Sequence, residues 1–335
     1  MHQDKSYIEI DFYKLWRYIR LTRVQKETIK NILFYSMPFL FNRFASFQYW
    51  KNALIFSENK KFIVPNLRSV DEIKLPVTRN EIPKPIDSLA IVMHVFYLDV
   101  FNDILSMILH MGEIKIKLFI TCPEYLSKDV QHTLLNFSFP FYIMSGDNRG
   151  RDILPFVKIL PKVLEENCDL VLKIHTKRSN HLNKKNLWGT DLFEKLLTKS
   201  NFDNIRSVFE KYPQIGMLGP AGNILPMSLY YGGNAKLVES LSLKMGLSRK
   251  QLKNLNFVAG SMFYARSVSL LPLLNLCLND NEFELENKQL DNTMAHAIER
   301  VFAAGLIVSG QYLVDSLSTV DKVSCKLTLN HPWSI

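Results

Sequence analysis

Short apolar runs alternate with segments of helical spacing from residue 88 almost to the end of the chain. The first run, SLAIVMHVF at residues 88–96, is apolar at nearly every position, which is typical of a parallel strand covered on both faces. The same reasoning predicts further strands at residues 116–121, 139–144, 169–175, 215–218, 257–265 and 306–309. Helical spacing predicts helices at residues 99–109, 126–137, 188–199, 202–212 and 291–304, and another from residue 152. Strands separated by such helices indicate an α/β fold with a mostly parallel sheet flanked by helices.

Two polar clusters follow predicted strands of this sheet. Residues 147–152 read DNRGRD, and residues 175–179 read HTKRS. In open α/β sheets, ligands bind in the crevice beyond the carboxyl ends of the strands. We therefore expect the clusters to bind one anionic ligand, the diphosphate of a nucleotide. The predicted ligand-binding residues are Asn148, Arg149, Gly150, Arg151, Asp152, His175, Lys177 and Arg178.

The DNRGRD cluster forms the turn between a strand and a helix. Backbone N–H groups at a helix start bind anions, and guanidinium groups bind phosphate oxygens in pairs. Asp152 is the predicted N-cap of the helix that follows. The glycine spacing fits neither the dinucleotide fingerprint nor the P-loop. The alternative is a solvated loop, in which Arg149 and Arg151 pair with Asp147 and Asp152.

The HTKRS cluster is cationic and contains no pair of acidic residues. Mg²⁺ and Mn²⁺ prefer carboxylate oxygens, which this cluster lacks. Lysine and arginine side chains can instead offset the charge that develops on a departing diphosphate. We therefore expect no metal site and no cofactor, and we disfavour a divalent metal ion.

Two further segments carry candidate chemistry. Asp291 precedes a helical pattern and could accept a proton from a hydroxyl group, or it could be only the N-cap of that helix. Glu286 is the second candidate for the base. Gly260 and Ser261 interrupt a predicted strand, which either admits a ligand or marks a bulge without function.

Composition indicates a folded globular chain with an anionic partner. The chain has 335 residues, of which 47% are hydrophobic and 22% charged, and its net charge is +9. The four cysteines lie far apart without metal-ligand spacing, so we expect them to be reduced. No secretory signal opens the sequence, and no run reaches the roughly 18–20 apolar residues of a membrane span. We therefore expect a cytoplasmic location.

The chain divides into an N-terminal helical extension with a linker (residues 1–85), a main domain (86–315) and a C-terminal tail (316–335). Within the extension, residues 12–56 alternate aromatic and basic side chains. Such a segment either packs its aromatic face on the main domain or lies in the headgroups of an anionic membrane. The second interpretation would place the chain on the inner face of the cytoplasmic membrane.

Several segments together resemble the rhamnan synthesis protein F family, in the same order over residues 88–310. They are DNRGRDILPF (147–156), LKIHTKRS (172–179), Trp188, GMLGP (216–220), AGSMF (259–263) and DNTMAHAIER (291–300). The resemblance implies a glycosyltransferase with a GT-A-like, Rossmann-type domain. Such an enzyme builds bacterial surface polysaccharide, either O-antigen, capsule or rhamnan, from a nucleotide-sugar such as dTDP-L-rhamnose.

The resemblance also assigns roles. Residues 175–177 would occupy the position of the acidic metal-binding motif, and Asp291 that of the inverting catalytic base. From their place at the end of the first predicted strand, His94 and Tyr97 are expected near the nucleoside of the donor. The acceptor, a lipid-linked or oligosaccharide chain, would contact Trp188, Gly260, Ser261, Met262 and His296. A core position is the alternative for Trp188.

Two rival interpretations involve no catalysis. The chain could bind nucleotides or nucleic acid, which would suit its positive charge. It could also serve as a scaffold in a polysaccharide assembly complex. The concentration of basic residues at two strand ends favours a compact phosphate site over nucleic acid.

Overall fold

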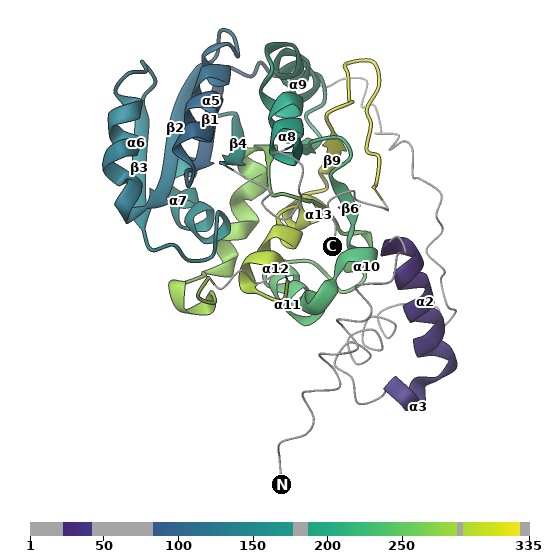
Figure 1. The fold of residues 1–335 in the computed structure, drawn as a ribbon. Helices are drawn as coiled ribbons and strands as arrows, with labels where there is room; N and C mark the ends of the chain where they lie inside the picture. The colour runs from purple at the N-terminus through teal and green to yellow at the C-terminus, as the bar shows by residue number, and fades with distance from the viewer. Residues whose placement is uncertain (1–22, 42–82, 177–186, 287–290, 329–335) are drawn as a thin grey trace.

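The computed structural model describes residues 23–41, 83–176, 187–286 and 291–328 (Figure 1). Its centre is a seven-stranded sheet with the order β3-β2-β1-β4-β8-β5-β9. The strands are β1 (Ser88–His94), β2 (Lys115–Pro123), β3 (Phe141–Gly146), β4 (Leu170–His175), β5 (Ile215–Gly219), β8 (Phe263–Arg266) and β9 (Tyr312–Asp315). All neighbouring pairs are parallel except those of β8, which runs antiparallel to β4 and β5. The predicted mostly parallel sheet is confirmed.

The winding of the sheet reverses direction next to β1. The chain proceeds outward from β1 to β2 and β3, and then returns to add β4 on the other side of β1. The last residues of β1 and β4, His94 and His175, lie opposite one another in the register. A reversal of this kind opens a crevice at the carboxyl ends of the two strands, where ligands of such folds bind.

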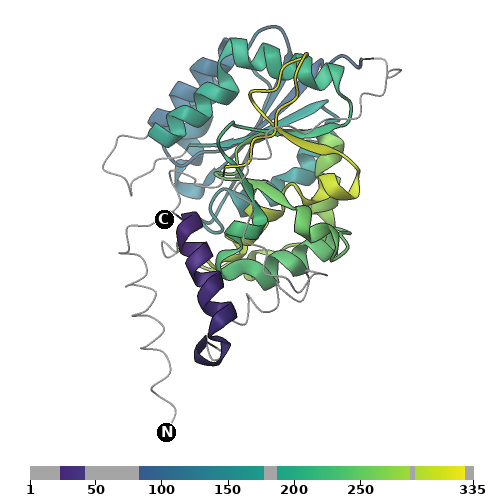
Figure 2. The ribbon, with the colours of Figure 1, turned by 90° about the vertical axis from the view of Figure 1, so that its right-hand side faces the viewer.

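Alternate residues of the central strands contribute to two separate cores. Leu89 and Ile91 of β1 pack on one face with α5 (Leu98–Leu109), α6 (Ser127–Leu134), α8 (Leu187–Leu197) and α9 (Lys199–Lys211). Ala90 and Val92 pack on the other face with α7 (Ile153–Glu165), α12 (Met294–Val301) and α13 (Ala304–Val308). Figure 2 shows the sheet between the two helical layers. The continuous apolar runs of the sequence therefore correspond to strands buried on both faces.

The remaining elements lie mostly at the edge of the second layer. A two-stranded sheet joins β6 (Ile224–Pro226) to β7 (Asn256–Val258). The other short elements are α10 (Met227–Tyr230), α11 (Ala235–Lys244), η1 (Glu124–Leu126), η2 (Gly232–Asn234), η3 (Gln251–Asn254), η4 (Ser267–Leu276) and η5 (Asp280–Glu282). Two helices of the predicted N-terminal extension fall in the described part, α2 (Arg23–Ser36) and α3 (Pro38–Phe41). None of the helices described is both long and apolar enough to cross a bilayer.

Two predicted strands are wrong. Residues 257–265 form two strands, β7 and β8, which belong to different sheets because the chain turns between them. Gly260 and Ser261 make this turn with φ values of 86° and 51°. Residues 306–309 lie mostly in helix α13, and the last strand, β9, begins only after Gly310. An apolar run this short has no period that separates a strand from a buried helix.

The predicted C-terminal tail begins directly after β9. Its described part, residues 316–328, packs on the domain, with Cys325 buried. The carboxylate of Asp315 is fully buried and accepts hydrogen bonds from the hydroxyl of Ser324 (2.9 Å) and the backbone N–H of Lys326 (2.7 Å). These contacts attach the tail to the edge of the sheet.

Candidate functional site

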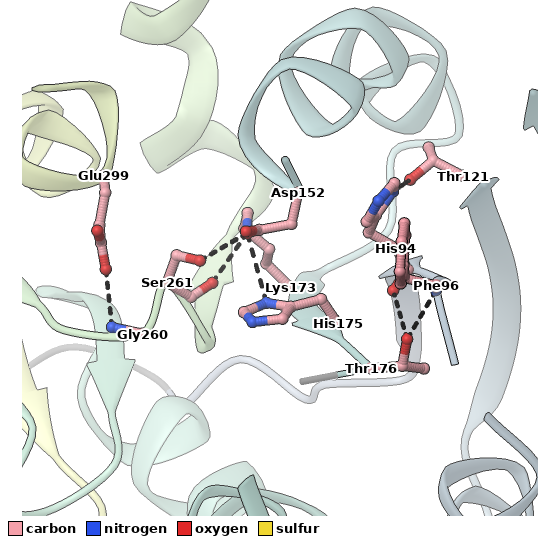
Figure 3. Close-up of polar contacts among 10 residues, drawn as sticks. All are labelled: His94, Phe96, Thr121, Asp152, Lys173, His175, Thr176, Gly260, Ser261 and Glu299. Atoms are coloured by element: carbon pink, nitrogen blue, oxygen red, sulfur yellow. Dashed lines mark hydrogen bonds and ion pairs between the residues drawn. The ribbon is translucent and has the colours of Figure 1, made fainter. Parts of the chain in front are cut away.

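The ends of β1 and β4 are joined by the side chain of Thr176 (Figure 3). Its hydroxyl oxygen accepts hydrogen bonds from the backbone N–H groups of Phe96 (2.7 Å) and Tyr97 (3.0 Å). Its own N–H donates to the carbonyl of His94 (3.0 Å). Thr176, the middle residue of the His-Thr-Lys sequence, therefore links the ends of the two strands by hydrogen bonds. Tyr97 stands at the N-cap position of α5, with its ring against that of Phe96.

A buried charged cluster lies beneath this edge. The ammonium group of Lys173, whose side chain is 1% exposed, lies 2.5 Å from Oδ2 of Asp152. It also donates to the hydroxyl (3.1 Å) and the carbonyl (3.0 Å) of Ser261. The Ser261 hydroxyl donates to the same Asp152 oxygen (2.6 Å), and Nδ1 of His175 lies 3.4 Å from it. We call these four residues the Asp152 cluster.

Asp152 does not cap helix α7, contrary to the sequence prediction. It occupies the N-cap position, but its side chain makes no capping hydrogen bond. The carboxylate turns inward instead, because the ammonium group of Lys173 would otherwise be buried without a counter-charge. Burial by itself raises the pKa of Asp152. The positive charges of His175 and Lys173, with hydrogen bonds from Lys173 and Ser261, outweigh it and hold that pKa far below its usual range.

His94 lies in a different environment on the neighbouring strand. Its Nδ1 atom lies 2.9 Å from the hydroxyl oxygen of Thr121 on β2. Burial lowers the pKa of His94 to about 4, against a smaller raising effect of the Asp152 charge. His94 is therefore neutral at pH 7 and forms hydrogen bonds without contributing charge.

The two arginines of the DNRGRD turn contact a distant segment of the chain. Arg149 donates from Nε to the carbonyl of Phe283 (2.9 Å). Arg151 forms an ion pair with Glu286 (3.0 Å) and donates to Nε2 of His296 (3.1 Å). Both contacts differ from the solvated-loop alternative, in which the arginines pair with aspartates of their own turn. The turn is therefore fastened to the segment that precedes Asp291.

Gly150 permits this close approach. Its φ is 66°, and a Cβ atom at this position would lie 2.5 Å from Cβ of Leu154 and 2.7 Å from Cδ1 of Phe283. Asn148 beside it is exposed. The glycine is therefore required both by its backbone conformation and by the packing around it.

Asp291 lies ahead of helix α12 and does not cap it. The N-cap is Thr293, whose side chain accepts from the backbone N–H of His296. The carboxylate of Asp291 instead pairs with Arg300 (2.9 Å) and accepts hydrogen bonds from the side chain of Asn234 (2.6 Å) and the N–H of Gly233 (3.2 Å). The N-cap alternative is therefore wrong.

Sequence reasoning missed the groups that hold this carboxylate. A Cβ atom on Gly232, where φ is 54°, would lie 1.9 Å from Oδ2 of Asp291, so only glycine fits there. Burial raises the pKa of Asp291, but the charge of Arg300 and the backbone hydrogen bonds outweigh it and lower that pKa. The Gly-Gly-Asn run at residues 232–234 was the available signal, because consecutive glycines often present backbone N–H groups to an anion.

The predicted acceptor residues that the structure describes are mostly buried. Met262 is fully buried, and the hydroxyl of Ser261 is engaged in the Asp152 cluster, so neither side chain faces an acceptor here. Gly260 donates its N–H to Glu299 (2.8 Å). His296 bonds Arg151 through Nε2 and Thr293 through Nδ1 (2.6 Å), and burial lowers its pKa. The predictions for Lys177, Arg178 and the side chain of Trp188 lie outside the described residues.

The residues described contain no group of three His, Cys, Asp or Glu side chains arranged to hold a metal ion. The position that the resemblance assigns to a metal motif offers few oxygen donors. The hydroxyl of Thr176 is already bonded to two amides, and the carboxylate of Asp152, 3.4 Å from Nδ1 of His175, is neutralised by Lys173. The donor set there is consequently a poor fit to a hard divalent cation.

Comparison with known proteins gives both sequence relatives and looser structural matches. Two Xanthomonas campestris pv. campestris proteins, described as uncharacterized protein WxcX, are each 35% identical over 237 residues. The match covers 71% of this chain but only 34% of either relative, so the chain spans about a third of their length.

Among solved structures, a mannosyltransferase from Pyrobaculum calidifontis in complex with GDP-Man and Mn²⁺ matches with a TM-score of 0.33 at 10% identity, covering 75% of this chain and 58% of that one. Mouse xyloside xylosyltransferase 1 matches with a TM-score of 0.28 at 10% identity, covering 67% and 82%. The family model described as rhamnan synthesis protein F matches residues 24–307, most of the chain. This protein belongs to the rhamnan synthesis protein F family.

Proposed function

We propose that this chain is a glycosyltransferase of bacterial surface polysaccharide synthesis. It transfers a sugar, rhamnose or another deoxy sugar or hexose, from a nucleotide-sugar to a growing O-antigen, capsule or rhamnan chain. The name of the family supports a role in polysaccharide synthesis. The observation that carries the proposal is the winding reversal between β1 and β4, because this is where folds of this kind bind nucleotides.

The donor diphosphate lies in this proposal between the end of β4 and the DNRGRD turn. His175 lies at one side, and Arg151, whose side chain is 37% exposed, at the other. Arg151 is paired with Glu286, so a phosphate group would replace or share that carboxylate. His94 and Tyr97 lie beside the nucleoside.

The transfer is a single displacement with inversion. A hydroxyl of the acceptor attacks the anomeric carbon, its proton passes to the carboxylate of Asp291, and the bond from that carbon to the diphosphate oxygen breaks. The charge of Arg300 and the backbone hydrogen bonds lower the pKa of Asp291, and its carboxylate is ionised at neutral pH, as a proton acceptor must be. Gly233, Asn234 and Arg300 hold it in one orientation. Glu286 is the replacement candidate for the base.

Cationic side chains, in this proposal, offset the charge of the leaving nucleoside diphosphate. The support is the donor set at the end of β4, where hydroxyl and carboxylate oxygens are already bonded and basic residues predominate. We therefore expect sugar transfer to survive excess EDTA. Loss of transfer with EDTA and its return with Mn²⁺ or Mg²⁺ would contradict this expectation.

A donor screen tests the proposed activity. The full chain is incubated with dTDP-L-rhamnose, UDP-glucose, UDP-galactose and GDP-mannose, and release of the nucleoside diphosphate is measured with and without oligosaccharide acceptor. We expect release from one donor, and release in the presence of acceptor that is at least about 10²-fold slower with the Asp291→Asn variant. A protein that releases no nucleoside diphosphate but is stabilised by single-stranded DNA in thermal-shift measurements would instead be a nucleic-acid-binding protein.

A peripheral membrane position for the N-terminal extension is also proposed. Ile32, Phe39 and Leu40 on α2 and α3 are exposed, Phe39 to 76%. Apolar side chains beside basic residues favour contact with an anionic bilayer.

A further inference from the structure

Two histidines stand side by side at the centre of the proposed donor site. His94 ends β1, His175 ends β4, and the two residues are partners in the parallel register. Their surroundings differ in charge. His94 contacts the hydroxyl of Thr121, whereas His175 lies 3.4 Å from the carboxylate of Asp152.

The Asp152 cluster requires a third charge to attract an anion. Lys173 and Asp152 carry opposite charges, and they cancel. If His175 is neutral, the cluster has no net charge. If His175 is protonated, the cluster presents one positive charge at the end of β4, where the side chain of His175 is 11% exposed.

Lys173 itself is not placed to contact a ligand. Its ammonium group is enclosed by Asp152 and Ser261, and lies 5.2 Å and 5.5 Å from the ring centres of Phe156 and Phe302. Its charge serves to keep Asp152 ionised inside the protein. Oδ2 of Asp152, in turn, lies 3.4 Å from Nδ1 of His175, within the range of an ion pair.

We propose that the two histidines hold opposite protonation states at neutral pH, with His94 neutral and His175 an imidazolium that faces the donor diphosphate. Asp152 and Lys173 are positioning residues, which keep His175 charged and oriented. This proposal rests on the proposed function for the identity of the anion. It goes further by assigning the positive charge at the end of β4 to one imidazole, and the maintenance of that charge to a buried ion pair.

Within the described part of the chain, the charged and titratable groups that face His175 come from three elements. Lys173 precedes it on β4, Asp152 approaches from the start of α7, and His94 lies across on β1. Ser261, from the turn between β7 and β8, contributes a neutral hydroxyl. The positive charge of Lys173 opposes the protonation of His175, and the negative charge of Asp152 favours it. Because Lys173 is already neutralised by direct contact with Asp152, the net effect of the two charges favours the imidazolium form of His175.

Nuclear magnetic resonance of the full chain with ¹⁵N-labelled histidine tests the protonation states without a ligand. His94→Gln and His175→Gln identify the two signals. At pH 7 we expect imidazolium shifts for His175 and neutral shifts for His94, with His94 remaining neutral to about pH 5. Neutral shifts for His175 at pH 7, or titration of the two residues together, would overturn the proposal.

The double variant Asp152→Asn with Lys173→Met separates positioning from folding. It removes both buried charges while keeping side-chain volume close to the original, so the chain should stay folded. We expect His175 to become neutral at pH 7 in this variant. An unchanged imidazolium signal would show that Asp152 does not maintain the charge.

Calorimetry from about pH 6 to pH 9 measures the binding of dTDP-L-rhamnose. It tests whether the positive charge of His175 contributes to donor affinity. The diphosphate diester keeps both negative charges over this range, so any change in affinity with pH comes from a titrating group of the protein. We expect affinity to fall at least about tenfold as His175 loses its proton, the lower end for a charge-assisted hydrogen bond. His175→Gln should bind weakly at every pH, and His175→Lys should bind well up to pH 9.

The His94→Gln variant is the matched control, since it should retain the pH dependence of binding. Wild-type affinity in His175→Gln at every pH would overturn the assignment of the charge. If dTDP-L-rhamnose does not bind, the same series is run with the donor that the screen identifies. If no donor binds, the proposed function fails, while the histidine spectra still decide the protonation states.

Discussion

Two ion pairs fasten the DNRGRD turn, and they differ in burial. Lys173 and Asp152 are 1% and 13% exposed, whereas Arg151 and Glu286 are 37% and 28% exposed. A buried pair cannot exchange its partner for water, so removal of one member leaves an uncompensated charge inside the protein. An exposed pair contributes little to stability and readily exchanges its partner. The first pair therefore maintains the architecture of the site, and the second is available to a ligand.

Breaking the buried pair should have the largest effect on stability. Lys173→Met alone leaves the Asp152 carboxylate buried without its counter-charge and should lower the free energy of unfolding by about 3–5 kcal/mol. Combining it with Asp152→Asn should recover most of that loss. Urea unfolding measures the effect, with Lys158→Met as the control, because Lys158 forms an exposed pair with Asp280 that is worth less than about 1 kcal/mol. Additive losses in the double variant would contradict a coupled pair.

The ion pair of Asp291 with Arg300 is intermediate in burial, with side chains 34% and 10% exposed. Asp291→Asn preserves the size of the side chain but removes the proton acceptor, and loss of a general base costs about 10²–10⁴-fold in rate. We expect sugar transfer to fall by at least the lower bound, while donor binding and folding persist. The loss of transfer is measured as the rate at saturating donor. Circular dichroism and nucleotide affinity are the controls for folding and donor binding. Near wild-type transfer would move the search for the base to Glu286.

The exposed pair should control nucleotide affinity with little effect on folding. Arg151→Ala should weaken nucleotide binding by about 1.5–3 kcal/mol, the size of a hydrogen bond to a charged group. Glu286→Gln should leave affinity unchanged or strengthen it, because it removes the carboxylate that competes with phosphate for Arg151. Calorimetry with the identified donor gives both values. Equal weakening by the two variants would show that the pair acts as a structural unit.

The smallest expected effect is that of the N-terminal helices on lipid. Each basic residue near an anionic surface contributes about 1 kcal/mol, and the exposed Phe39 adds apolar contact. Liposome flotation should therefore show binding to anionic vesicles that weakens with salt and with Phe39→Ser. The matched control is Tyr125→Ser, which changes an exposed aromatic residue on the main domain. Equal flotation on neutral and anionic vesicles would contradict an electrostatic association.

Sequence reasoning placed the two polar clusters after predicted strands, but it did not orient the side chains within them. The two polar clusters were expected at strand ends, and the parallel register brings the ends of β1 and β4 together. It expected Asp152 and Asp291 to be able to cap helices, because capping is the most frequent local use of an aspartate before a helix. In the structure, Asp152 pairs with Lys173, and Asp291 pairs with Arg300.

Most of the order of strands and helices, the burial of the central strands and the place of the DNRGRD turn were determined by the sequence itself. Hydrophobic periodicity and helix starts depend on neighbours within a few residues, so they can be read along the chain. The partners of Asp152 and Asp291 were decided only by the tertiary structure. Gly233, which holds Asp291, lies 58 residues away along the chain. Buried charges take whichever counter-charge the packing brings to them, and packing joins segments that no local pattern connects.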